Sequence, residues 1–252
     1  MDSNTILWIT AIIMLAGGLL ILAVGKRRTP SEGLQTVLHG IIPIIAACLY
    51  FAMATGQGAV ALPTSEVIPG GTPGTRIFYF ARYIDWTFTT PLLLLALSFT
   101  AMHAGRKRTG AIVGCILADV MMIITAFAFG ASETAWVKWT WFLISCVAFL
   151  GVYYVIWVSQ LEANALERDD IRSSYRRDAT ILSVLWLAYP IVLAVAPDGL
   201  GVLSDASSVL LIAILDVLAK PVAGLLSVIS DTKATDRDMA EQGSAAKATR
   251  TA

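Results

Sequence analysis

Charged residues are scarce in this chain. Lys, Arg, Asp and Glu make up 14% of the 252 residues, and 18 basic residues balance 18 acidic ones, so the formal net charge is zero. A chain without a basic excess lacks the electrostatic footprint of a nucleic-acid-binding protein, which argues against a nucleic-acid partner. The mean hydropathy is +0.73 and 57% of the residues are hydrophobic, too apolar for an ordinary soluble domain. The composition predicts a multi-pass integral protein of the cell membrane, in contact with the lipid bilayer.

Cysteine is also scarce. Cys48, Cys115 and Cys146 lie singly in three different apolar segments. No metal-ligand spacing links them, so we interpret them as small core residues and predict no metal site. The first apolar run lacks a basic leader and is long enough to cross a bilayer. We therefore expect a retained helix there and not a cleaved signal peptide.

A membrane-spanning helix needs about 20 mostly apolar residues. Seven stretches meet this requirement: about Asn4–Val24, Leu34–Gly56, Ile77–Met102, Gly110–Gly130, Thr134–Gln160, Asp178–Ala196 and Ser207–Ser230. The expected fold class is therefore an all-α membrane protein, a bundle of seven transmembrane helices spanning residues 1–230. The glycine- and proline-rich segment 57–76 is typical of a short β-hairpin-like loop between the second and third helices. The small, polar residues 231–252 are expected to form a disordered cytoplasmic tail.

The basic residues of the loops predict the orientation of the bundle, because such loops stay on the cytoplasmic side. The loops after the first, third and fifth helices carry ten basic residues: Lys26, Arg27, Arg28, Arg106, Lys107, Arg108, Arg168, Arg172, Arg176 and Arg177. The opposite side offers only Arg76 and Lys138. We therefore expect an extracellular N-terminus and a cytoplasmic C-terminus.

Ionisable residues inside two of the apolar stretches indicate a functional site. A charge at the centre of a bilayer costs at least about 2.5–3.5 kcal/mol, so such a residue is retained for a reason. Asp216 and Lys220 are four residues apart and share one helix face. They form either an inert neutralising pair or a lysine held dry for covalent chemistry.

The third apolar stretch carries a matching set. Arg82, Asp85 and Thr89 are spaced three and four residues apart and therefore lie on one face of a helix. Arg82 and Lys220 give two positive charges, and Asp85 and Asp216 give two negative ones. Their sum is zero, as a dry bundle centre demands. On charge alone, a purely structural quadruplet remains an open alternative.

Three sequence runs carry a resemblance to a known family. They are RYIDWTFTTPLLLL at residues 82–95, WLAYP at residues 186–190 and LDVLAK at residues 215–220. They resemble the microbial (type 1) rhodopsins, in particular the bacteriorhodopsin-like proton pumps, and the resemblance extends over all seven helices. Three motifs on three helices in the same order make a chance match very improbable.

The resemblance implies a chromophore and a set of site residues. All-trans retinal would be bound to Lys220 as a protonated Schiff base, with Asp85 as counterion and first proton acceptor and Asp216 as second counterion. Arg82 would help to keep Asp85 ionised, and Thr89 would hydrogen-bond it. Tyr50 and Tyr189 would hold Asp216, and Asp119 would be bonded to Thr90 in a structural role. The implied retinal pocket comprises Trp86, Thr90, Leu93, Met122, Trp141, Phe142, Ser145, Trp186 and Tyr189.

The function implied by the resemblance is outward transport of protons driven by light, the work of a transporter and not of an enzyme. Relatives that pump chloride have an uncharged residue at the position of Asp85, and sodium pumps have Asn and Gln at the positions of Asp85 and Thr89. Inward-pumping relatives typically replace the carboxylate of Asp216 by proline. Family resemblance also suggests a homo-oligomer, either a trimer or a pentamer.

The chain departs from the family pattern at both ends of the proton path. Ala96 stands eleven residues after Asp85, where related pumps have the cytoplasmic donor carboxylate, and His39 is a candidate substitute with bulk water as the alternative. Asp198 matches one of two release carboxylates, whereas Ser208 replaces the other.

A photosensory rhodopsin that signals to a transducer is the competing interpretation. The missing donor at Ala96 favours it, because a slow photocycle lengthens the signalling state. Ala219 argues against it, because sensory relatives often have threonine next to the retinal lysine. Pro221 lacks a backbone N–H and is expected to kink the last helix at the cofactor.

Overall fold

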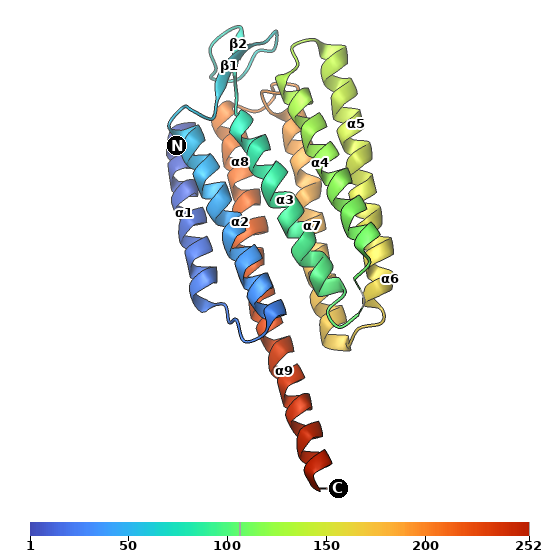
Figure 1. Ribbon diagram of the computed structural model, residues 1–252. Helices are drawn as coiled ribbons and strands as arrows, with labels where there is room; N and C mark the ends of the chain where they lie inside the picture. The colour runs from blue at the N-terminus through green and yellow to red at the C-terminus, as the bar shows by residue number, and fades with distance from the viewer. Residues whose placement is uncertain (106, 252) are drawn as a thin grey trace.

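The computed structural model describes the backbone of residues 1–105 and 107–251, and side chains as far as Ser244. Arg106, one of the basic residues expected on the cytoplasmic side, lies outside the described residues. Seven helical spans are long and apolar enough to cross a membrane, as predicted. They pack side by side as one bundle, with the two chain ends at opposite ends of it (Figure 1).

Each span has a defined set of bounds. The first four are α1 (Ser3–Val24), α2 (Pro30–Ala54), α3 (Phe80–Ala101) and α4 (Thr109–Ala131). The fifth runs through α5 (Ala135–Tyr154), the π-helical turn η1 (Val155–Gln160) and α6 (Leu161–Asn164). The sixth is α7 (Asp169–Val195). The seventh runs through α8 (Asp205–Val217), the π-helical turn η2 (Leu218–Val222) and α9 (Ala223–Thr251).

Local sequence explains where α2 begins and where the seventh span contains a π-helical turn. α2 begins after Thr29, whose hydroxyl accepts a hydrogen bond from the Glu32 amide (3.2 Å), with Pro30 at the first helical position. In η2, Pro221 has no N–H to donate, and the amide of Ala223 bonds back to the carbonyl of Leu218, five residues earlier. The expected distortion at Pro221 is therefore a π-helical turn at the lysine.

α1 packs directly against this turn. A Cβ placed on Gly17 of α1 would lie 2.5 Å from the Cβ of Pro221, closer than van der Waals contact allows. Glycine at this position therefore permits α1 and η2 to approach one another. The helix that carries Lys220 is consequently fixed from its outer side.

The predicted hairpin is present between α2 and α3. Strands β1 (Val60–Pro63) and β2 (Thr75–Phe78) pair antiparallel, with Val60 opposite Phe78 and Pro63 opposite Thr75. They lie above one end of the bundle, next to the N-terminus (Figure 1). We call this end the hairpin end, and the other end the tail end.

Two boundaries differ from the sequence-based expectation. α7 begins at Asp169, nine residues before the predicted start, because acidic residues in its first turn favour a helix N-terminus although they are not apolar. The helix α9 continues to Thr251, where a disordered tail was expected for residues 231–252. In Figure 1 it projects beyond the bundle at the tail end.

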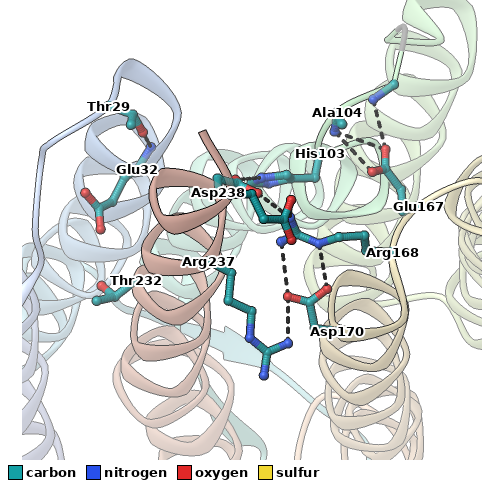
Figure 2. Close-up of polar contacts among 12 residues, drawn as sticks. Thr29, Glu32, His103, Ala104, Glu167, Arg168, Asp170, Thr232, Arg237 and Asp238 are labelled. Carbon is teal, nitrogen blue, oxygen red and sulfur yellow. Dashed lines mark hydrogen bonds and ion pairs between the residues drawn. The ribbon is translucent and has the colours of Figure 1, made fainter. Parts of the chain in front are cut away.

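Ion pairs with the loops account for the first turns of this extension. Asp238 pairs with Arg168 (2.5 Å) and with His103 Nε2 (2.9 Å), and Arg237 pairs with Asp170 (3.0 Å). Figure 2 shows Arg168 between Asp238 and Asp170, so that one guanidinium links the tail to the start of α7. A network of this kind stabilises a helix more than its separate surface pairs would.

A buried ion pair fastens the hairpin to the bundle. Arg76 of β2 pairs with Asp198 in the loop between α7 and α8, and the two side chains are 1% and 5% exposed. Arg76 Nη2 also donates to the carbonyl of Gly130 at the end of α4 (2.7 Å). Burial raises the pKa of the Asp198 carboxyl, and the positive charge of Arg76 opposes that shift. Arg76 therefore connects the hairpin with α4 and with the α7–α8 loop.

Replacing Arg76 by methionine tests this anchor. We expect Arg76→Met to destabilise the protein by about 3–5 kcal/mol, because it leaves the Asp198 carboxylate buried without a partner. The double variant Arg76→Met/Asp198→Leu should recover much of that loss. Denaturant titration of the purified protein measures the effect. Arg172→Met breaks an exposed pair with Asp169 and is the control; an equally small effect of Arg76→Met would contradict the prediction.

Candidate functional site

Three charged side chains meet at the middle of the bundle. The Lys220 Nζ atom contacts Asp85 Oδ2 and lies 3.3 Å from Asp216 Oδ1. The three side chains are at most 2% exposed. The sequence predicted that these residues from α3, α8 and η2 act together, and the structure brings them into contact. A buried amine between two carboxylates is held in place from both sides.

Asp216 is the better-partnered of the two carboxylates. Tyr50 Oη donates to its Oδ2 (2.7 Å), and Tyr189 Oη donates to its Oδ1 (2.6 Å), as predicted. Trp86 Nε1 is a third donor, at 3.3 Å from Oδ1. These donors come from α2, α7 and α3, so the position of Asp216 is fixed by three neighbouring helices.

Asp85 is held more loosely. Its Oδ1 atom has no hydrogen-bond partner among the described residues. Thr89 contacts Asp85, but its hydroxyl donates to the backbone carbonyl (2.8 Å), a bond to the preceding helical turn that threonine commonly makes. Asp85 therefore has an oxygen that can accept a proton or a further hydrogen bond.

Arg82 is buried but makes no ion pair with a described residue. Its guanidinium lies over the ring of Tyr79, 5.3 Å from the ring centre, and its Nε has no hydrogen-bond partner among the described residues. It is one helical turn from Asp85, towards the hairpin end. The expected four-charge cluster is thus a contact of three charges, with Arg82 one turn away.

A cavity adjoins the lysine. It encloses about 730 Å³ of space free of protein atoms, including the part that is open to the outside. Eight of the predicted pocket residues line it: Trp86, Thr90, Leu93, Met122, Phe142, Ser145, Trp186 and Tyr189. Seven lining residues were not predicted: Ile123, Ala126, Phe129, Cys146, Phe149, Pro190 and Ala219; Leu193 also lines the cavity. Lys220 and Asp216 also border the cavity.

Trp141 does not line this cavity, although the sequence predicted that it would. Its side chain is 37% exposed on the outer face of α5. Phe142 and Ser145 line the cavity from the inner face of α5. Trp141 is four residues before Ser145, so helical spacing alone did not exclude it, and the rotation of α5 within the bundle turns its side chain outward.

The predicted contact between Asp119 and Thr90 is present. The Thr90 hydroxyl lies 2.7 Å from Asp119 Oδ2 on α4 and 2.7 Å from the Trp86 carbonyl. Thr90 has only one hydroxyl proton, so both contacts are hydrogen bonds only if Asp119 carries a proton. This arrangement links α3 to α4 beside the cavity.

His39 and Asp198 lie on opposite sides of the lysine. His39 is 7% exposed and borders a second cavity towards the tail end, together with Leu97 and Thr100 of α3. Asp198 is at the hairpin end in its pair with Arg76. Ser208, at the position of the second release carboxylate, donates to the backbone carbonyl of Asp205 (2.9 Å).

The fold and the central contacts define a class of protein. It is a seven-helix membrane protein with a buried lysine between two carboxylates, next to an aromatic cavity. The family model "Bacteriorhodopsin-like protein" matches residues 1–234. The chain therefore belongs to the bacteriorhodopsin-like family of microbial rhodopsins.

Individual relatives agree with this assignment. Archaerhodopsin-2 from Halobacterium sp. (strain aus-2) is 34% identical over 95% of this chain and 92% of its own length. The crystal structure of thermophilic rhodopsin from Rubrobacter xylanophilus is similar with a TM-score of 0.80 and 35% identity, covering 91% of this chain and 96% of that one. The crystal structure of the light-driven proton pump LR (Mac) from Leptosphaeria maculans gives 0.83 and 31%, covering 92% and 97%.

The cavity fits the chromophore of this family. Microbial rhodopsins bind retinal, a long apolar molecule with an aldehyde at one end. The cavity is lined mainly by aromatic and aliphatic side chains, and the one primary amine on its wall is Lys220. An apolar cavity with a single primary amine matches both the apolar body and the aldehyde end of retinal, because an amine condenses with an aldehyde to a Schiff base.

Neighbouring aromatic residues of α5 provide a test of the cavity wall. We expect Phe142→Ala to shift the absorption maximum and to weaken retinal binding, because it removes a lining side chain. Trp141→Ala, the control, should leave the absorption maximum unchanged because this side chain faces outward. Absorption spectra after titration with retinal measure both effects. A larger effect of Trp141→Ala than of Phe142→Ala would contradict the assignment of the wall.

Proposed function

We propose that this protein is a light-driven outward proton pump. The observation that carries the proposal is the Lys220 amine between two buried carboxylates of unequal hydrogen bonding. All-trans retinal, bound to Lys220 Nζ as a Schiff base, would supply light absorption and a change of shape on isomerisation. The side chains of the protein hold and move the proton.

The unequal environments of the two carboxylates support Asp85 as the first proton acceptor. Asp216 accepts hydrogen bonds from Tyr50, Tyr189 and Trp86, which stabilise its ionised form. Asp85 touches Nζ and has one oxygen without a partner among the described residues. The proton on Nζ therefore passes to Asp85. The transfer cancels two opposite buried charges and removes the cost of keeping both ionised in a dry site.

The order of residues along the bundle supports outward transport. Asp85 lies six residues into α3 from the hairpin end, and Arg82 and Tyr79 follow in the same direction. The excess of basic loop residues predicts that the hairpin end is extracellular. Asp198 is the candidate for the final release at that end. Its buried position and raised pKa suit a carboxyl that can hold a proton before release, and the positive charge of Arg76 beside it favours the ionised form once that proton has left.

A photosensory role is the second candidate. Ala96 is fully buried and cannot carry a proton, so α3 offers no donor on the tail side, and a slow cycle suits a sensor. Pumping is favoured by the Asp85–Lys220–Asp216 contact and by relatives such as the protein from Leptosphaeria maculans that is described as a light-driven proton pump.

Assembly as a trimer or pentamer is part of the proposal.

Illumination of an unbuffered suspension of expressing cells, with retinal added, tests the function. We expect acidification of the medium that a protonophore abolishes. Asp85→Asn should abolish acidification while the pigment still forms, because the first acceptor is lost. Asp119→Asn is the matched control, since Asp119 lies beside the cavity but away from Nζ. Alkalinisation would mean inward transport, and an unchanged pH would favour the sensor.

His39 is the proposed group on the tail side of the lysine. We expect His39→Ala to slow reprotonation of Lys220 Nζ several-fold at neutral pH, because the imidazole is a titratable group in the cavity on that side. Flash photolysis across a pH series follows this step. Equal decay rates in the variant and the unmodified protein would show that bulk water alone supplies the proton.

A further inference from the structure

The tail side of the bundle lacks a carboxylate on α3 but has one on α7. Between Trp86 and Ala101, α3 contains no titratable residue. The second cavity lies on this side and is lined by His39, Leu93, Leu97, Thr100, Asp178, Ile181, Leu182, Ala219, Ala223 and Ser227. Leu93 and Ala219 border both cavities, so the second begins where the retinal cavity ends. Asp178 is the carboxylate on its wall.

Asp178 lies between this cavity and the solvent. It is eight residues before Trp186, which corresponds to about 12 Å along α7 towards the tail end. Its Oδ2 accepts a hydrogen bond from Ser227, another residue of the cavity wall (3.0 Å). Its Oδ1 accepts from Arg177 Nε (2.8 Å), and the Arg177 side chain is 38% exposed. One carboxylate oxygen thus faces the cavity wall and the other faces a solvent-exposed guanidinium.

His39 borders the same cavity from α2. Its Nδ1 atom has no hydrogen-bond partner among the described residues, although the side chain is buried. Together with Thr100, Ser227 and Asp178 it gives the cavity four polar side chains. A buried water needs two to four polar partners, and this wall provides them. A proton entering at Asp178 therefore has a polar route to His39.

We propose that Asp178 is the proton-uptake carboxylate of this chain. It takes the place of the donor carboxylate that is absent from position 96, where the chain has alanine. It takes a proton from the solvent side and passes it, through the cavity shared with His39, to Lys220 Nζ. Each transfer breaks one bond to the proton and forms another, so Asp178 and His39 return to their starting states. One proton moves from bulk water to Nζ. This inference rests on the proposed function, because it supplies the uptake step of that pump.

Other charged groups lie near Asp178, at the solvent side of the second cavity, which we call its mouth. Arg177 also donates to Ser230 Oγ of α9 (2.7 Å), which holds α7 and α9 together there. Asp231 follows Ser227 by four residues on the same face of α9, and its Oδ2 has no partner among the described residues. Asp231 does not line the cavity, so it can attract protons to the mouth but is not on the inner path.

Flash photolysis of the full-length, retinal-reconstituted protein tests the role of Asp178. We expect Asp178→Asn to slow reprotonation of Nζ by about tenfold or more, because a positioned proton-transfer group contributes about 10²–10⁴-fold and a cavity near water recovers part of it. Azide, a small diffusible proton carrier, should restore the rate. Asp178→Glu should retain it. A merely structural role would respond neither to azide nor to the conservative variant.

The matched control is Asp170→Asn. Asp170 lies on the same helix and pairs with Arg168 and Arg237 outside the cavity (Figure 2). Its loss should leave the reprotonation rate unchanged. The dark absorption spectrum shows whether each variant has folded around retinal.

Two failures can be told apart. If the unmodified protein acidifies the medium and Asp178→Asn reprotonates at the same rate, the role of Asp178 is overturned and the pump stands. If the unmodified protein does not acidify the medium, but Asp178→Asn slows reprotonation and azide restores its rate, the uptake role is supported and the pump is overturned. The uptake role would also be overturned if reprotonation in Asp178→Asn stays slow in the presence of azide and reprotonation in Asp178→Glu is slow as well.

Discussion

The contact of Lys220 with Asp85 and Asp216 is the interaction on which the structure depends. In a dry bundle centre an unpaired charge is costly, so the helices that carry these residues must pack closely enough to bring them together. Tyr50, Tyr189 and Trp86 add hydrogen bonds to Asp216 from three directions. Gly17 allows α1 to approach the π-helical turn that carries Lys220. The packing of several helices is thus organised around one amine.

The two sides of this contact differ in their chemistry. Towards the hairpin end, Arg82, Tyr79, Arg76 and Asp198 provide a dense set of polar and charged groups. Towards the tail end, α3 is apolar, and the polar groups come from other helices, with His39, Asp178 and Ser227 around one cavity. In the proposed pump, a proton that leaves Nζ towards the hairpin end meets many such groups, whereas a proton that returns from the tail end meets few.

Much of the fold followed from the sequence because hydropathy and glycine, proline and charge patterns are local. The seven spans and the hairpin were predicted correctly, and so were the contacts of Lys220, Asp216 and Asp119. Asp178 was taken as the edge of an apolar stretch. The structure places it nine residues inside α7, because the charged first turns of a helix extend beyond its apolar window.

Other parts of the site depend on three-dimensional packing. The side to which Trp141 points and the oxygen to which Thr89 donates are set by helix rotation and by local back-bonding. The helical course of residues 231–251 goes with ion pairs to distant loops, which no local pattern reveals. The pairing of Arg76 with Asp198 joins residues 122 positions apart, and only the folded bundle brings them together.

Infrared difference spectroscopy of the retinal-loaded protein tests the central claim most directly, since it detects which carboxylate gains a proton after illumination. We expect a light-induced carbonyl band of a protonated carboxyl group that disappears in Asp85→Asn and shifts in Asp85→Glu. A band that persists unchanged in Asp85→Asn would show that the proton leaves Lys220 for another group and that Asp85 is not the first acceptor.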